Sequence, residues 1–181
     1  IKSFDDIKDK FTAETYLVAR SSGGLATLRY LSDNPDLKLK SLHLVATSFV
    51  PDDINTTQDR VKVQAKEFYG TGFDYQKIEK NIEFVNLHFS TNDPVVDFEV
   101  CRKYQEVMPK AIIKKYQLEH FDIPEFPDLI EFITILEKNT WTEIEGQKYR
   151  VKLLEKDKLP LILPDVDDYK PSSDGRSPHS K

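Results

Sequence analysis

The sequence predicts a three-layer α/β domain built on a mostly parallel sheet. Short, almost wholly apolar runs alternate with segments whose apolar residues recur every three or four positions, which is the pattern of buried parallel strands joined by helices. The chain has 181 residues, of which 39% are hydrophobic. That length and composition suffice for one domain with a sizeable core and a smaller appendage.

The first elements follow one another closely. Apolar residues on one face predict a short helix over 1–11, and the apolar run at 15–19 predicts a strand buried on both faces. A helix with leucines at spacing three follows and ends before Asn34-Pro35, because the residue before a proline avoids the α region. The next strand is predicted over 41–50.

The same alternation continues along the chain. Two further buried strands are predicted over 82–90 and 111–118, with helical or loop segments around 60–80 and 97–108 between them. A last helix is expected over 126–137. These strands would complete a mostly parallel sheet.

The character of the sequence then changes. Apolar and polar residues alternate around Glu145-Gly146, which predicts a small β hairpin. The stretch LPLILPDVDDYKPSSDGRSPHSK that follows is typical of an extended, proline-rich connector. We therefore predict a domain over 1–138 and a hairpin plus connector over 139–181.

Composition excludes several classes of function. The net charge is −5 and acids are interspersed with bases, so no basic stripe is present to bind nucleic acid directly. A single cysteine, Cys101, excludes an internal disulfide framework and a cysteine-rich zinc site. No apolar run approaches the ~20 residues of a membrane span. We expect a cytoplasmic location, no membrane partner, and no metal or cofactor for this segment.

One strand-to-helix turn carries a possible nucleophile. The apolar run ends in Ala19-Arg20-Ser21-Ser22-Gly23. A catalytic serine sits in such a turn with small residues two positions to either side, because larger side chains would clash there, and the Ser22 N–H at the helix start would stabilise an oxyanion. The alternative is that Ser21 or Ser22 merely caps the helix.

The order of later residues favours the nucleophile. Asp93 follows the predicted strand 82–90, and His120 follows the predicted strand 111–118. Serine, acid and histidine after successive parallel strands would meet at one sheet edge in the order that a hydrolase triad of this class requires. Taken singly, Asp93 fits an Asx-turn before proline and His120 a loop histidine without a role.

Three segments carry a family resemblance. VARSSGGLATLRY, FDYQKIEKNIEFVNLHFSTNDPVV and EHFDIPEFPDLIEFI resemble the small α/β-hydrolase-fold serine hydrolases of the retinoblastoma-binding-protein-nine type. The resemblance implies a nucleophile at Ser21, a ring-orienting acid at Asp93, a general base at His120 and a small acyl substrate. Family members begin with a strand and loop that supply the second oxyanion N–H. We therefore expect an N-terminally truncated hydrolase fold that lacks its first strands, and altered substrate contacts at Arg20, where the family often has histidine.

A second resemblance covers residues 150–178. This segment is similar to the part of leucyl-tRNA synthetases where the chain leaves the editing region and re-enters the catalytic core, although His179 stands where leucine is expected. It implies a fragment of a synthetase-like protein that carries the hydrolase domain as an insertion. ATP-dependent leucylation of tRNA, with ATP as cofactor, would then take place elsewhere in the parent chain. The alternative is a free-standing serine hydrolase acting on an ester, amide or thioester.

The other candidate side chains have simpler explanations. His43 and His88 lie inside predicted strands, where histidines are usually packed or hydrogen-bonded. His179 lies in the connector and is expected to be solvated. Cys101 fits a half-buried small apolar residue on a helix. No spacing among these groups predicts a metal site.

Overall fold

The computed structural model describes residues 2–138, 141–144, 147–152 and 161–162, with side chains over 4–134. The chain forms two compact units, Ile1–Asp122 and Ile123–Lys181.

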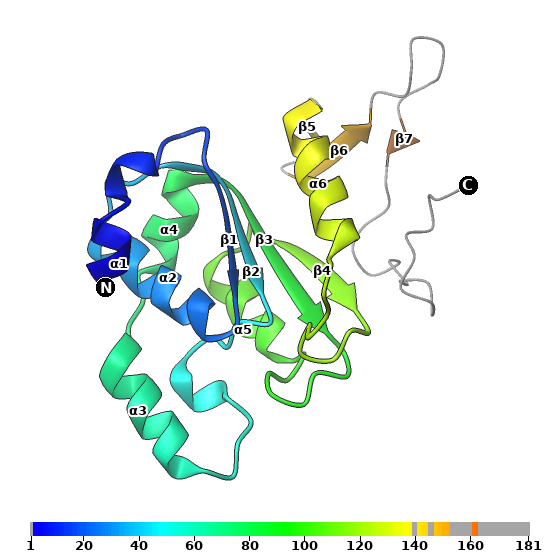
Figure 1. The fold of residues 1–181 in the computed structure, drawn as a ribbon. Coiled ribbons are helices and arrows are strands. Elements are labelled where there is room, and N and C mark those ends of the chain that lie inside the picture. The colour runs from blue at the N-terminus through cyan, green and yellow to red at the C-terminus, as the bar shows by residue number, and fades with distance from the viewer. Residues whose placement is uncertain (1, 139–140, 145–146, 153–160, 163–181) are drawn as a thin grey trace. The chain divides into compact units, whose positions relative to one another are not determined.

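The first unit is built on a four-stranded parallel sheet (Figure 1). Its order is β1-β2-β3-β4, and each strand pairs in parallel with the next one along the chain. The carboxyl ends of all four strands therefore meet at one edge. This confirms the predicted α/β class with a parallel sheet. The strands are β1 (Tyr16–Arg20), β2 (Leu39–Val45), β3 (Ile82–Ser90) and β4 (Ile112–Tyr116).

Helices connect these strands, and residues at their termini explain where several of them begin or end. The α2 helix stops at Asp33 because Asn34 precedes a proline. Asp74 caps α4 by accepting the Lys77 N–H at 3.1 Å, and Gly70 ends α3 with a φ of 72°. The helical elements are α1 (Lys2–Asp5), η1 (Lys8–Lys10), α2 (Ser22–Asp33), η2 (Pro51–Asp53), α3 (Asp59–Tyr69), α4 (Tyr75–Asn81) and α5 (Val100–Val107).

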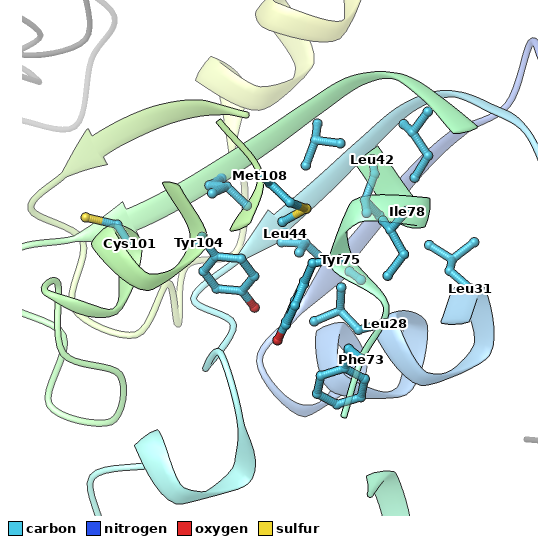
Figure 2. Close-up of a cluster of buried hydrophobic side chains, with 14 of the residues drawn as sticks. Leu28, Leu31, Leu42, Leu44, Phe73, Tyr75, Ile78, Cys101, Tyr104 and Met108 are labelled. Carbon is cyan, nitrogen blue, oxygen red and sulfur yellow. The ribbon is translucent and has the colours of Figure 1, made fainter. Parts of the chain in front are cut away.

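The core of this unit is one apolar cluster that joins sheet and helices (Figure 2). Leu42 and Leu44 of β2 belong to it together with Leu28 of α2, Ile78 of α4 and Tyr104 of α5. The leucines among them are completely buried. Each such side chain contributes about 2 kcal/mol of transfer free energy relative to exposure. This packing holds α2 against the sheet.

The alternate residues of the strands form a buried polar layer. The Ser41 hydroxyl lies 2.8 Å from His43 Nε2, His43 Nδ1 lies 3.1 Å from His88 Nε2, and His88 Nδ1 lies 3.0 Å from the Tyr116 hydroxyl. Both histidines are completely buried. The prediction that they are packed, hydrogen-bonded residues of strands is confirmed.

Two predicted elements differ most from the structure. The strand predicted over 41–50 ends at Val45, because Ala46 takes a φ of 46° and turns the chain out of the sheet. The helix predicted over 1–11 is divided into α1 and η1. Its apolar face is real, since the rings of Phe4 and Phe11 both pack against Tyr30.

The second unit contains α6 (Pro127–Lys138) and short strands. β5 (Trp141–Ile144) and β6 (Gln147–Lys152) pair antiparallel and confirm the predicted hairpin. β7 (Leu161–Ile162), within the predicted connector, pairs with β6. The remainder of that connector lies outside the described residues. In the part of the chain that the structure describes, no helix is long and apolar enough to cross a membrane.

Candidate active site

Ser21 occupies a strained turn between β1 and α2. Its φ of 52° and ψ of −125° are costly for a residue with a Cβ, by about 1–3 kcal/mol. The Ser21 N–H donates to the Val45 carbonyl of the neighbouring strand at 2.8 Å, which fixes the turn against the sheet. The sharp bend presents the hydroxyl at the carboxyl edge of the sheet, as in the turn that carries a nucleophilic serine.

The Ser21 hydroxyl does not cap the helix that follows. Ser21 stands at the N-cap position of α2, yet its side chain makes no capping hydrogen bond. Its Oγ instead lies 2.8 Å from His120 Nε2. Ser22 is exposed and is the first residue of α2. Because of that position, its N–H has no acceptor within the helix. That amide carries the positive end of the helix dipole beside the Ser21 hydroxyl.

The His120 ring bridges Ser21 and Asp93. Its Nδ1 lies 3.0 Å from both carboxylate oxygens of Asp93. A carboxylate can only accept, so Nδ1–H donates and the lone pair of Nε2 faces the Ser21 hydroxyl. The Asp93 side chain is 1% exposed and that of His120 12%. The structure therefore brings together the three residues predicted from their order in the sequence.

Asp93 also makes the Asx-turn expected of it as a simple turn residue. Its Oδ1 accepts the N–H groups of Val95 at 2.7 Å and Val96 at 3.0 Å. These amides stabilise the charged carboxylate and fix its orientation. The turn and the contact with His120 thus belong to one arrangement.

Two further side chains join the loops that carry Asp93 and His120. The Ser90 hydroxyl accepts the Leu118 N–H at 2.8 Å and donates to Asn92 Oδ1 at 2.7 Å. The same Asn92 oxygen accepts the Glu119 N–H at 3.0 Å. This brace matters because the backbone beside His120 is unusual: φ is 48° at Glu119 and 56° at Phe121.

Arg20 contacts the same loop. Its Nε and Nη2 donate to the carbonyl oxygen of His120 at 3.1 Å and 2.8 Å. Its Nη2 also pairs with the carboxylate of Asp122. The residue immediately before Ser21 thus holds the main chain of His120.

The sequence predicts a steric clash for a side chain two positions after Ser21, at Gly23. The structure shows such a clash at the next residue, Gly24. Among the described residues, a Cβ at Gly23 would meet no atom within 4 Å beyond its chain neighbours and the backbone of its own helix, so the clash expected at this position is not found. A Cβ at Gly24 would come within 2.0 Å of the Thr47 hydroxyl oxygen. The missing side chain at Gly24 lets α2 pack directly on the loop after β2.

The remaining candidates lie outside this site. Burial lowers the pKa of His43 to about 4 and that of His88 well below its ordinary value, so both rings are neutral. Cys101 is buried in the core, more completely than predicted, and burial raises the pKa of its thiol. His179 is not among the described residues. Within those residues no group of three histidine, cysteine or acidic side chains could hold a metal ion.

Sequence reasoning missed the brace around His120. Ser90 and Asn92 stand directly at the end of a strand and just before Asp93. Short polar side chains at such positions commonly bind nearby backbone groups, which is the one local signal available. For Arg20 the family resemblance predicts only a substrate contact.

Comparison with known proteins identifies the fold. Neither a protein-family model nor a curated protein matches the chain. Among solved structures, the ydeN gene product of B. subtilis is 22% identical with a TM-score of 0.61, over 76% of this chain and 73% of that one. A putative aryl esterase from Burkholderia cenocepacia is 14% identical (TM-score 0.54, 76% and 70% covered). A structure reported for carboxylesterases of Nitrososphaera gargenis is 12% identical (TM-score 0.53, 76% and 72% covered). The chain therefore has the α/β-hydrolase fold.

Proposed function

We propose that this chain is a serine hydrolase that cleaves an ester, amide or thioester of a small carboxylic acid. The observation that carries the proposal is the position of the His120 ring, 2.8 Å from the Ser21 hydroxyl and 3.0 Å from the Asp93 carboxylate. A serine hydroxyl is a weak nucleophile until a neighbouring base takes its proton. The strained turn and the α/β-hydrolase fold support the same reaction class.

The first half of the reaction forms an acyl-enzyme. Ser21 Oγ attacks the substrate carbonyl carbon while its proton passes to His120 Nε2. Asp93 holds the ring in the required tautomer and stabilises the imidazolium that results. The carbonyl oxygen becomes an oxyanion, and the Ser22 N–H at the positive end of α2 is placed to stabilise it. The tetrahedral intermediate then expels the alcohol, amine or thiol, which takes the proton from His120.

Water completes the turnover by the same groups. His120 Nε2 removes a proton from a water molecule, which attacks the acyl carbon bound to Ser21. Collapse of the second tetrahedral intermediate returns the proton to Ser21 Oγ and releases the carboxylic acid. These steps use side chains and one backbone amide alone.

Within this reaction class we favour the small hydrolases of the retinoblastoma-binding-protein-nine type, on the motifs around Ser21, Asp93 and His120. The leucyl-tRNA synthetase interpretation of 150–178 stays a prediction from the sequence. Its residues lie outside the described part except for 150–152 and 161–162. The contacts among the three triad side chains favour the hydrolase alternative over it.

Hydrolysis of p-nitrophenyl acetate and butyrate tests the proposal. Esters are tried first because two fold neighbours bear esterase names. We expect kcat/KM to fall by about 10³-fold or more in Ser21→Ala, because the nucleophile is lost. Ser22→Ala is the matched control, since it removes an adjacent hydroxyl and keeps the backbone N–H; its activity should stay within about threefold. Equal activity of Ser21→Ala and the unmodified chain would contradict the proposal.

A further inference from the structure

We propose that Arg20 is a positioning residue that couples the nucleophile to the general base. This inference rests on the proposed function, because it assigns a role within the same site. Arg20 is the last residue of β1 and directly precedes Ser21. Its guanidinium donates through Nε and Nη2 to one acceptor, the carbonyl oxygen of His120. One side chain thus connects the strand that delivers the hydroxyl to the peptide that carries the imidazole.

The backbone around His120 needs such a contact. Positive φ values at Glu119 and Phe121 place the histidine between two residues in conformations that their side chains disfavour. Residues in such regions keep their geometry only when surrounding contacts over-determine it. Ser90 and Asn92 hold the amides before the histidine, at Leu118 and Glu119. Arg20 holds the carbonyl of the histidine itself.

The chemistry of the guanidinium suits this task. Its planar fork offers two N–H groups in a fixed geometry, which a lysine ammonium cannot reproduce. The carboxylate of Asp122 pairs with Nη2 and restrains the fork. Asp122 also offsets the positive charge, so an anionic substrate would compete with a carboxylate already in place. We therefore assign Arg20 to placement of the base and not to recognition of a substrate charge.

Kinetics of Arg20→Met on a neutral and an anionic ester separate these roles. The variant keeps an unbranched apolar stem and loses every donor. We expect kcat to fall by about 10- to 100-fold on both p-nitrophenyl butyrate and the mono-p-nitrophenyl ester of glutaric acid, because small displacements of a catalytic group cost this much. KM should stay within about twofold. Arg20→Lys should recover only part of kcat, since it restores charge without the fork.

Arg102→Met is the matched control. Arg102 lies on α5, is 73% exposed and pairs with Glu99, so the same substitution there changes the same charge. Its kcat should equal that of the unmodified chain. Thermal unfolding of each variant shows whether the assay temperature lies below the transition. If Arg20→Met does not fold, Asp122→Asn is used instead. It weakens the ion pair that restrains the Arg20 guanidinium and should lower kcat by a smaller factor.

Proton NMR gives a readout that does not depend on turnover. The proton between His120 Nδ1 and Asp93 should resonate far downfield, and Arg20→Met should weaken or shift that signal while Arg102→Met leaves it unchanged. An unchanged resonance and kcat in Arg20→Met would overturn the inference, as would a rise in KM confined to the anionic ester. Absence of Ser21-dependent hydrolysis in the unmodified chain would overturn the proposed function instead, with the resonance still testing the contact.

Discussion

His43 and His88 contact each other ring nitrogen to ring nitrogen at 3.1 Å, fully buried on neighbouring strands. Burial lowers the pKa of both rings, and the Lys114 charge adds to the effect for each. The folded protein therefore holds both rings neutral at pH values where the unfolded chain, with ordinary histidine pKa values near 6.5, binds protons.

Stability should consequently fall as the pH drops from about 6.5 toward 4. In this window each buried histidine contributes a slope of about 1.4 kcal/mol per pH unit, because only the unfolded state takes up its proton. Above pH 6.5 the contribution is constant. In His43→Gln the unfolding free energy, measured with urea at each pH, should therefore fall by about 1.4 kcal/mol less per pH unit than in the unmodified chain. An identical slope in both proteins would mean that His43 is protonated in the fold.

Replacement of Asp93 tests the orientation of the base. In Asp93→Asn an amide faces His120 Nδ1 and no longer specifies the tautomer with its lone pair toward Ser21. We expect kcat to fall by about 10³-fold while KM changes little. Asp97→Asn is the control, since the Asp97 carboxylate accepts the N–H of Glu99, a contact within its own turn. A loss of activity in Asp97→Asn as large as that in Asp93→Asn would argue against a specific role for Asp93.

The Ser90 brace can be separated from general stability. Ser90→Ala removes the hydroxyl that accepts the Leu118 N–H and donates to Asn92 Oδ1. We expect this to lower the unfolding free energy by about 1–2 kcal/mol. Ser32→Ala removes a comparable hydroxyl, at the opposite end of α2 from Ser21, that accepts the Asp74 N–H at 2.9 Å. We expect similar losses in unfolding free energy from both variants and a loss of kcat only from Ser90→Ala. Equal kcat values would mean that the brace does not place His120.

The two adjacent glycines of α2 should respond oppositely to alanine. Gly24→Ala forces a Cβ to within 2.0 Å of the Thr47 hydroxyl oxygen, so we expect a loss of about 1–3 kcal/mol in unfolding free energy. Gly23→Ala meets open space and improves helix propensity, so it should stabilise by up to about 1 kcal/mol. Denaturant unfolding of the two variants measures both. The account of this helix start is wrong if Gly24→Ala is the more stable of the pair.

The sequence predicted an element's bounds best where the residue types at its two ends mark them. The strand over 82–90 matches β3 at both ends, because its apolar run is bounded by a helix and a polar turn. The strand over 41–50 was predicted too long, since the turn at Ala46 uses a positive φ without a glycine or proline to mark it. The break at Gly70 between α3 and α4 was not predicted either, since the pattern around 60–80 indicates only helical or loop segments.

Part of the candidate site could likewise be predicted from the sequence, and part could not. The order of Ser21, Asp93 and His120 follows from parallel topology, because each lies just beyond the carboxyl end of a strand. The contacts of Arg20 with the His120 carbonyl join residues a hundred positions apart, and nothing in local periodicity encodes them. The strained φ values beside His120 are likewise a product of tertiary packing.

Labelling with a fluorophosphonate, followed by peptide mapping, shows directly whether Ser21 is an activated nucleophile. The reagent phosphonylates a serine only when a neighbouring base activates it, so it reports on the triad without a known substrate. We expect a single modified residue, Ser21, with labelling abolished in Ser21→Ala, greatly slowed in His120→Ala and retained in Ser22→Ala. Labelling at another serine, or labelling that persists unchanged in Ser21→Ala, would contradict it.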